Sequence, residues 1–308
     1  MDRISKSIET VNTELPHIEC RLDEALKLHT SFRIGGPVRA MFFPKSTDEL
    51  VALCSMLRGC GTEPLIIGNG TNLLADDIKP LEIIAVKTTA INDALQTGEE
   101  ELTACAGISL SKLATIARDC GLSGLEFAHG IPGTLGGAVS MNAGAYGSEM
   151  KDVVISSEAY GYDTGTFRIT ADEHGFSYRH SRFSDSRDVV LSSVIKLKRG
   201  DKDSIGAKMD ELNILRRESQ PLELPSAGST FKRPKDGYAA KLIENAGLKG
   251  YTVGGAQVSS KHAGFVVNKG GALFSDVMAV IDHVRMTVWN RFGIELEPEI
   301  KIIARKDG

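Results

Sequence analysis

Cysteine and histidine are too few and too scattered in this sequence for the sites they usually build. The chain of 308 residues has five cysteines and seven histidines. It contains no C-x-x-C pair, no H-E-x-x-H motif and no His or Cys pair at metal-ligand spacing, so zinc and iron chemistry are not indicated. The odd set of cysteines, in apolar or helical contexts, is typical of reduced thiols in a cytosol. These cysteines are Cys20, Cys54, Cys60, Cys105 and Cys120.

Long apolar runs and an excess of positive charge are also missing. No stretch approaches the ~18 apolar residues that a membrane helix needs. The opening sequence MDRISKSIETVNTELP has neither an apolar core nor a cleavage signature. The net charge of −4 leaves no basic footprint for nucleic acid. We therefore expect a cytoplasmic protein with no membrane insertion and no nucleic-acid partner, and no obligate protein partner is indicated.

The common nucleotide-binding fingerprints are incomplete or absent. The loop Gly68-x-Gly70-x-x-Leu73 lacks the third glycine of the Rossmann fingerprint. No G-x-x-x-x-G-K-[ST] sequence occurs anywhere in the chain. These absences argue against a Rossmann NAD domain and against a kinase-like phosphate loop.

Glycine, by contrast, is concentrated in one segment. Residues 130–147 read GIPGTLGGAVSMNAGAYG, with six glycines in eighteen residues. Glycine lets backbone N–H groups approach a bound group without an intervening Cβ, which is how loops hold a pyrophosphate. A set of plain turns is the alternative, but Ile131, Leu135 and Val139 are unlike a flexible linker. Two glycine loops about sixty residues apart suggest one extended ligand that both loops hold, and FAD is long enough to need two such segments.

Length and periodicity predict two or three lobes rather than one core. Expected strands run from Met41 to Phe43, Leu65 to Ile67, Val153 to Ile155, Thr166 to Ile169, Val189 to Lys196 and Ile300 to Ala304. Expected helices run from a cap at Ser46 to about Arg58, Ser109 to Cys120, Ser204 to Glu218, Ala239 to Ala246 and Asp276 to Phe292. The charged run from Lys198 to Asp203 marks a domain boundary near residue 201.

Several motifs along the chain are similar to those of one flavoprotein family. They are HTSFRIGGP at 29–37, GNGTNLL at 68–74, the glycine segment at 130–147, YRHSRF at 178–183, PSAGSTFK at 225–232, KHAGFVVN at 261–268 and LEPEI at 296–300. In this order they resemble the UDP-N-acetylenolpyruvoylglucosamine reductase (MurB) family, relatives of the vanillyl-alcohol-oxidase flavoproteins. The resemblance covers the chain from about residue 20 to its last residue.

The resemblance implies an α+β fold in two domains. Residues 1–200 would form a two-lobed FAD-binding domain of the PCMH type, with lobes at about 20–87 and 88–200. Residues 201–308 would form an α+β substrate-binding domain.

The resemblance also implies a two-stage hydride transfer. NADPH would reduce non-covalently bound FAD, and UDP-N-acetylglucosamine enolpyruvate would then take the hydride in the same site. The product would be UDP-N-acetylmuramate, a peptidoglycan precursor. The protein must orient both substrates, stabilise negative charge beside the substrate carboxylate and deliver a proton.

Three residues carry catalytic roles by resemblance. Ser229 would donate the proton, which a serine can do only beside a strongly basic enolate. Arg179 would hold the substrate carboxylate or enolate oxygen through its planar fork. Glu299 would be a hydrogen-bonding partner or proton relay. From residue chemistry alone, Ser229 reads as a turn hydroxyl and the other two as surface charges.

Binding residues follow the same motifs. The cofactor set is Gly68, Asn69, Gly70, Thr71, Asn72, Leu73, Gly130, Ile131, Pro132, Gly133, Thr134, Gly136, Gly137, Ala138, Asn142, Gly144 and Ala145. Candidates for the UDP diphosphate, the sugar or the NADPH phosphates are Tyr178, Arg216, Arg217, Lys261, His262 and Asn268. Solvated surface positions are the alternative for each of these candidates.

Three further points stay open. Some members of the family carry a tyrosine-bearing loop for which this chain has no obvious room after Glu211, so it resembles the shorter subtype. A sugar or alcohol oxidase of the same superfamily, and a binding protein without turnover, are the alternative functions. Since no Rossmann-type ribose-binding acid is recognisable, the sequence does not decide between NADPH and NADH.

Overall fold

A computed structural model describes residues 2–235 and 237–304 of the chain, which group into two compact units by contact. The first unit holds the residues through Leu22 together with Arg39–Asn69 and Ile83–Leu215. The second holds Asp23–Val38, Gly70–Glu82 and the residues from Arg216 onward. Because these units are defined by contacts alone, the domain boundary expected near residue 201 stays a prediction.

A four-stranded sheet with two covering helices forms the first lobe. Its strand order is β1 (Glu19–Ala25), β2 (Pro37–Phe43), β5 (Leu81–Lys87) and β3 (Leu65–Ile67), with β3 and β5 parallel. Helices α1 (Arg3–Glu14) and α2 (Thr47–Gly59) contact each other beside it. Their apolar faces share one core with the sheet. Members of this core include Ile8, Val11, Leu50, Leu53, Leu57, Ile84 and Val86.

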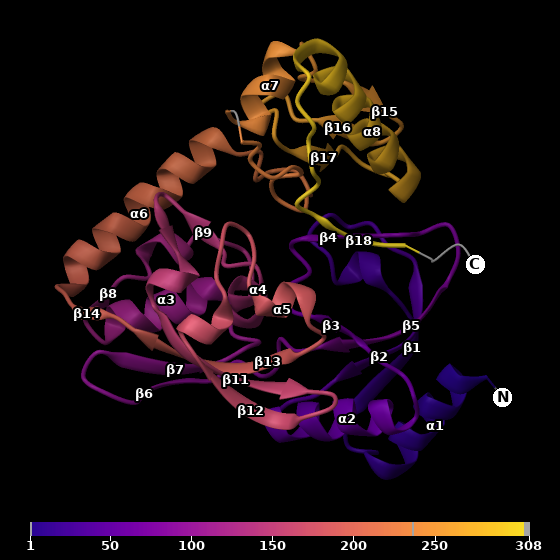
Figure 1. The fold of residues 1–308 in the computed structure, drawn as a ribbon, viewed down its shortest axis with the longest axis vertical. Coiled ribbons are helices and arrows are strands. Elements are labelled where there is room, and N and C mark those ends of the chain that lie inside the picture. The colour runs from indigo at the N-terminus through magenta and orange to yellow at the C-terminus, as the bar shows by residue number, and fades with distance from the viewer. Residues whose placement is uncertain (1, 236, 305–308) are drawn as a thin grey trace. The chain divides into compact units, whose positions relative to one another are not determined.

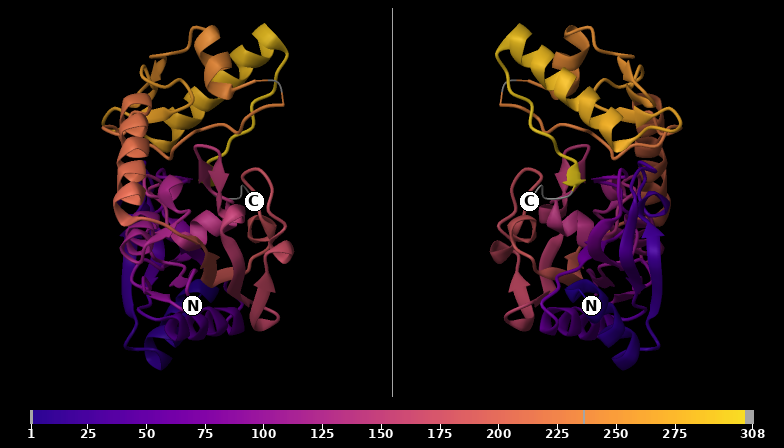
Figure 2. Two further views of the ribbon diagram at one scale, coloured as in Figure 1. Left: turned by 90° about the vertical axis from the view of Figure 1, so that its left-hand side faces the viewer. Right: turned by 90° about the vertical axis from the view of Figure 1, so that its right-hand side faces the viewer.

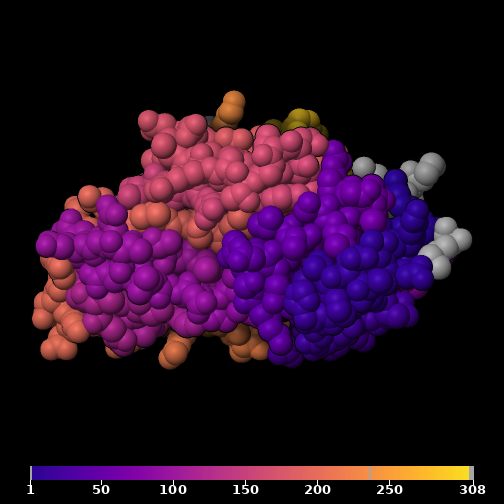
Figure 3. Space-filling view, turned by 90° about the horizontal axis from the view of Figure 1, so that it is seen from below, coloured from indigo at the N-terminus to yellow at the C-terminus, as the bar shows by residue number. Residues whose placement is uncertain are grey.

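An antiparallel sheet of five strands forms the second lobe of the first unit (Figure 1). Its order is β12 (Gly165–Thr170), β11 (Val154–Gly161), β13 (Val189–Lys196), β7 (Glu101–Cys105) and β6 (Ala94–Gln96). Helices α3 (Leu110–Asp119) and α4 (Leu135–Ser140) share its core. Figure 3 shows the indigo first lobe beside the magenta second lobe. Tyr160 and Leu191 of the five-stranded sheet join the core of the first lobe.

Further elements connect these strands and helices. They are β8 (Leu122–Ser123), β14 (Lys198–Arg199), β9 (Gly144–Ala145), β10 (Ser148–Glu149), α5 (Arg182–Asp185), α6 (Lys202–Ser219) and four 3-10 turns, η1 (Leu26–Leu28), η2 (Glu126–Ala128), η3 (Met150–Asp152) and η4 (Asp172–His174). Of these, η1 and the last residues of α6 fall within the second unit.

The second unit is built around one long helix. Helix α8 (Phe274–Phe292) contacts α7 (Ala239–Asn245) and the three-stranded sheet of β15 (Thr252–Val253), β16 (Ala256–Val258) and β17 (Val266–Asn268). In both views of Figure 2, α8 is the long yellow helix. Strands β4 (Leu73–Ala75) and β18 (Lys301–Ile303) pair in parallel within the same unit. Phe32, Ile34 and Leu74 join the apolar face of α8 in its core.

Most of the elements expected from the sequence are confirmed. Ser46 caps α2 by accepting from the Glu49 N–H. Helix α8 buries one apolar face before Gly293, whose φ is +67°, and the residues of that face are Val277, Val280, Ile281, Val284 and Val288. The sequence analysis missed α1, although Asp2 caps it through Ser5 and Ile8 and Val11 face the core. Among the helices of residues 2–235 and 237–304, none is long and apolar enough to cross a membrane.

Burial of Lys87 at the end of β5 gives the fold a pH-dependent penalty. Burial lowers the pKa of Lys87 to about 8, so between about pH 8 and its ordinary value the unfolded chain binds more protons than the folded one. The contribution of Lys87 therefore makes the free energy of unfolding rise with pH between these two values. We expect Lys87→Met to stabilise the fold at pH 7 by about 1 kcal/mol, a figure discounted for the partial exposure of the side chain. In urea titrations the gain should shrink between pH 8 and pH 10, and a gain that grows with pH would contradict this account.

Candidate active site

The two glycine loops touch each other within the first unit. Asn69 Nδ2 donates to the Pro132 carbonyl at 3.0 Å. A Cβ at Gly68 would overlap the Thr134 hydroxyl, so only glycine allows the two segments to approach this closely. In the second unit a Cβ at Gly70, whose φ is +62°, would overlap the carbonyl oxygen of His29. Glycine at 68 and at 70 is therefore explained by close backbone packing.

Close packing at Gly68 predicts a large effect for a single methyl group. Gly68→Ala must displace Thr134, and overpacking of this kind costs about 1–3 kcal/mol. We expect a lower thermal midpoint and weaker FAD binding, and Gly68→Ala combined with Thr134→Ala should recover part of both. Gly59→Ala is the matched control, because its Cβ meets nothing within 4 Å at the end of α2. Equal effects of the 68 and 59 substitutions would contradict this packing.

Backbone amides in both loops point to an anionic ligand. In the described part of the chain, no hydrogen bond is found from the N–H groups of Asn69, Gly133 and Thr134. The same holds, within the second unit as described, for the N–H groups of Gly70 and Thr71. Successive amides left available by glycine-containing turns are suited to phosphate oxygens. The residues present therefore fit the diphosphate of FAD.

Asn142 fastens the glycine segment to the loop that carries Arg179. It is fully buried with φ +42°, and its Nδ2 donates to Glu149 Oε2 at 2.8 Å and to the Ser177 carbonyl at 2.9 Å. Its Oδ1 accepts from the Lys151 N–H at 3.0 Å. The side chain of Asn142 is thus occupied inside the protein, and its expected contact to the cofactor stays a prediction.

Arg179 stands on a loop that is held at both ends. Its φ is +55°, a left-handed conformation that is uncommon for a residue with a side chain and recurs at functional sites. Its Nη2 donates to the Gly144 carbonyl at 3.1 Å, and its guanidinium lies 5.3 Å from the ring centre of Tyr178. The Ser181 hydroxyl donates to the Ser140 carbonyl at 2.8 Å. The structure therefore places Arg179 against the glycine segment.

A buried histidine anchors the start of the same loop. His174 has no exposed surface, bonds to Ser157 Oγ and the Thr170 carbonyl, and stacks on Phe176 at 4.6 Å between ring centres. Burial lowers the pKa of His174, because the charged form of the ring is disfavoured away from water. His174 therefore acts as a structural support a few residues before Arg179.

In the second unit, the backbone of Glu299 is bonded to the segment that follows Ser229. The Glu299 N–H donates to the Thr230 carbonyl at 2.8 Å, and Phe231 pairs with Pro298 in an antiparallel bridge. Thr230 is buried, and its hydroxyl accepts from the Val266 N–H at 3.0 Å. Ser229 itself is exposed and Glu299 is half-buried. One backbone hydrogen bond thus joins Glu299 to the residue that follows Ser229 in the sequence, and the catalytic roles of Ser229 and Glu299 stay predictions.

The six candidates for substrate contacts differ in how they are engaged. Tyr178 is exposed, and Arg216 and Arg217 lie near the end of α6. Lys261 Nζ donates to the Arg217 carbonyl at 2.5 Å. His262 Nδ1 accepts from the Gly264 N–H, and burial lowers its pKa. Asn268 is buried and donates to the Phe32 carbonyl at 3.1 Å while its Oδ1 accepts from Gly270 and Ala272. Only Asn268 has its side chain committed to the core.

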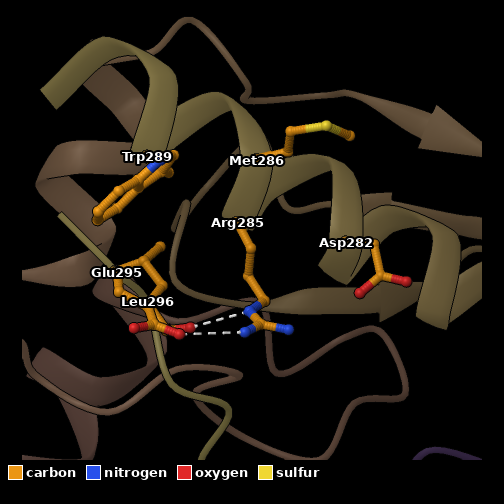
Figure 4. Close-up of a pocket in the computed structure, with 6 residues that line it drawn as sticks. All are labelled: Asp282, Arg285, Met286, Trp289, Glu295 and Leu296. Carbon is orange, nitrogen blue, oxygen red and sulfur yellow. Dashed lines mark hydrogen bonds and ion pairs between the residues drawn. The ribbon is translucent and has the colours of Figure 1, made fainter. Parts of the chain in front are cut away.

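Two pockets among the described residues are lined without any of the predicted site residues. One, of about 420 Å³ on α8, is lined by Asp282, Arg285, Met286, Trp289, Glu295 and Leu296 (Figure 4). There Arg285 donates to the Leu296 carbonyl at 3.1 Å and pairs with Glu295, so its charge is neutralised locally. The other, of about 630 Å³ in the first unit, is lined by ion pairs such as Arg187 with Glu63.

Sequence reasoning missed two parts of this arrangement. It gave no role to the segment at His29–Ser31, although the motif itself was recognised. In the structure the Ser31 N–H donates to the Gly70 carbonyl at 3.1 Å and its hydroxyl to the Ser226 carbonyl at 2.6 Å. It also gave no role to Thr230, whose only signal was its place directly after Ser229.

The fold and the glycine loops together define an FAD-binding protein with a second α+β domain. Residues 38–170 match the model of an FAD binding domain. Residues 220–303 match the model of the C-terminal domain of UDP-N-acetylenolpyruvoylglucosamine reductase. The mixed α+β class expected from the sequence is confirmed.

Relatives over the whole length identify the family. A UDP-N-acetylenolpyruvoylglucosamine reductase of Caldanaerobacter subterraneus is 49% identical over 92% of this chain and 94% of its own. The enzyme of the same name from Pediococcus pentosaceus is 45% identical over 97% of this chain and 99% of its own. The crystal structure of the MurB enzyme from Thermus caldophilus superposes with a TM-score of 0.78 at 32% identity, covering 93% of this chain and 98% of that one.

This chain belongs to the UDP-N-acetylenolpyruvoylglucosamine reductase family. It is an FAD-dependent oxidoreductase of peptidoglycan precursor synthesis with NADPH as its electron donor. The reading of the motifs as a reductase of this family is thereby confirmed.

Proposed function

We propose that the N–H groups of the two glycine loops hold the FAD diphosphate. The cofactor set named from the sequence, apart from the side chain of Asn72, lies around it. The support is the set of amides in both loops for which no acceptor is found among residues 2–235 and 237–304. When bound, the flavin would supply the hydride-transfer chemistry between NADPH and the substrate. The chain itself must then supply binding, orientation and one proton.

Ser229, Glu299 and Arg179 share the work on the substrate. Hydride arriving at the terminal vinyl carbon leaves a pair of electrons on the carbon beside the carboxylate, as an enolate. Arg179 binds the oxygen that gains charge, because a guanidinium is permanently charged and forms two parallel hydrogen bonds. The Ser229 hydroxyl gives its proton to the carbon, and Glu299 hydrogen-bonds to the enolate or relays a proton. The observation that supports this assignment most is the Glu299 N–H bond to Thr230, beside Ser229.

The remaining assignments rest on the position of each residue within the motifs. Tyr178, Arg216, Arg217, Lys261 and His262 contact the UDP diphosphate, the sugar or the NADPH phosphates, since anionic ligands need such donors. Residues 201–308 form the substrate-binding domain, and the chain is of the shorter subtype. We place the reaction in the cytoplasm, with no nucleic acid and no obligate protein partner, and the five free cysteines accord with a reducing compartment.

Substrate-dependent turnover tests this function. NADPH consumption without oxygen should require UDP-N-acetylglucosamine enolpyruvate, and the product should be heavier than the substrate by two hydrogens. Equal NADPH consumption with and without this substrate would contradict the proposal. Oxygen uptake driven by a sugar or an alcohol would support the oxidase alternative instead.

A further inference from the structure

The peptide groups of Glu299 connect the segment that carries Ser229 to the glycine loop at 68–74. The Glu299 N–H donates to the Thr230 carbonyl at 2.8 Å, next to Ser229. The Glu299 carbonyl accepts from Asn72 Nδ2 at 3.3 Å. All four residues belong to the second unit. The backbone that carries the Glu299 carboxylate is therefore bonded on one side to the segment that carries Ser229 and on the other to Asn72.

Asn72 is itself fixed to the strand that follows Glu299. Its carbonyl accepts from the Lys301 N–H at 2.9 Å, and the parallel pairing of β4 with β18 begins at Leu73 and Lys301. Asp76 extends this pairing by donating its N–H to the Ile303 carbonyl at 2.8 Å. A shift of the loop at Gly70–Asn72 must therefore be transmitted to Glu299.

We infer that Asn72 is a positioning residue that sets the orientation of the Glu299 peptide, and through it the carboxylate, from within the loop proposed to hold FAD. This inference rests on the proposed role of Glu299. Asn72 does not reach the reacting atoms in this role. Its side-chain amide donates a further hydrogen bond to the Glu299 peptide, and small errors in placing a reacting group cost large factors in rate.

The inference gives Asn72 a task different from a flavin contact. A side chain that binds FAD directly would affect the affinity for FAD and both half-reactions. A side chain that orients Glu299 would affect the oxidation of the reduced enzyme by substrate and leave its reduction by NADPH nearly unchanged. The two tasks can therefore be separated by kinetics.

A double-mutant cycle between positions 72 and 299 tests the inference. We expect Asn72→Ala to slow the oxidative half-reaction by about tenfold or more, as misplacement does, and to shift its pH profile. Reduction by NADPH and the dissociation constant of FAD should change less than about twofold. Combined with Glu299→Gln, Asn72→Ala should have almost no further effect, because the carboxylate it orients is gone. Asn72→Gln, which keeps the amide donor, should recover part of the rate.

Asn92→Ala is the matched control, since its Nδ2 donates to the Thr89 carbonyl at 3.0 Å in the first unit. It should leave both half-reactions unchanged. Multiplicative effects of Asn72→Ala and Glu299→Gln would overturn the inference, as would a loss of FAD affinity equal to the loss of rate. A wild-type oxidation rate of Glu299→Gln alone would instead remove Glu299 from the proposed mechanism, and the inference with it.

Discussion

Ser229→Ala is expected to abolish the oxidation of the reduced enzyme by its enolpyruvyl substrate while leaving reduction by NADPH near the wild-type rate. Hydride transfer to the vinyl carbon is favourable only if the resulting enolate is protonated, and general acids contribute about 10²–10⁴-fold to such steps. We expect a loss of about 10³-fold in the oxidative half-reaction. Single-turnover kinetics with the reduced enzyme measure it directly.

Ser226→Ala is the matched control for Ser229→Ala. It removes a hydroxyl from the same segment, where Ser226 Oγ accepts only a long bond of 3.4 Å from the Gly228 N–H. The rates of both half-reactions should stay within about twofold of wild type, because this hydroxyl takes no part in the proposed reaction. If Ser229→Ala slowed both half-reactions equally, the cause would lie in folding or in FAD binding, and the proton-donor role would be wrong.

Arg179→Lys carries the second largest expected effect. Lysine keeps the charge but loses the planar fork, so it cannot form two parallel hydrogen bonds to the carboxylate or enolate. The positive φ of 55° is no harder for lysine than for arginine, so the loop should keep its shape. We expect about a 10²-fold lower rate of oxidation by substrate at saturation, typical of losing one preorganised donor in the transition state.

A neighbouring arginine provides the control for that loss. Arg182 lies over the ring of Phe167 at 5.5 Å and pairs with Asp188, so Arg182→Lys changes a guanidinium that is already engaged within the protein. Rapid-mixing measurements should show wild-type oxidation for Arg182→Lys. Comparable losses at 179 and 182 would mean that positive charge in this region, and not the fork of Arg179, matters for the reaction.

The parts of the fold that depend on local pattern were predictable from the sequence. Helices α2, α3 and α8 each have an apolar face with capping signals close to the helix ends, and these signals predict where each helix begins and ends to within a few residues. Helix α1 carries the same signals, a cap at Asp2 and a buried face with Ile8 and Val11. Propensity alone does not predict the two-residue strands β8 and β14, which exist only because they pair.

The motifs identify the positions of the candidate catalytic residues, but they do not predict the contacts that hold these residues. The bond from Asn72 to Glu299 joins residues that are 227 positions apart, and no local pattern foretells such a partner. The sequence likewise marked Asn142 as a ligand residue because it stands among glycines. The structure shows its amide bonded to Glu149 and Ser177, since a buried amide must satisfy its donors within the protein.

The most direct measurement is an anaerobic double-mixing experiment that follows the visible absorbance of the bound flavin. The purified enzyme is first mixed with NADPH and, after bleaching, with UDP-N-acetylglucosamine enolpyruvate. The account predicts that the yellow colour returns at a rate that depends on the enolpyruvyl substrate, with no oxygen present. Recovery of the colour only after air is admitted would contradict it.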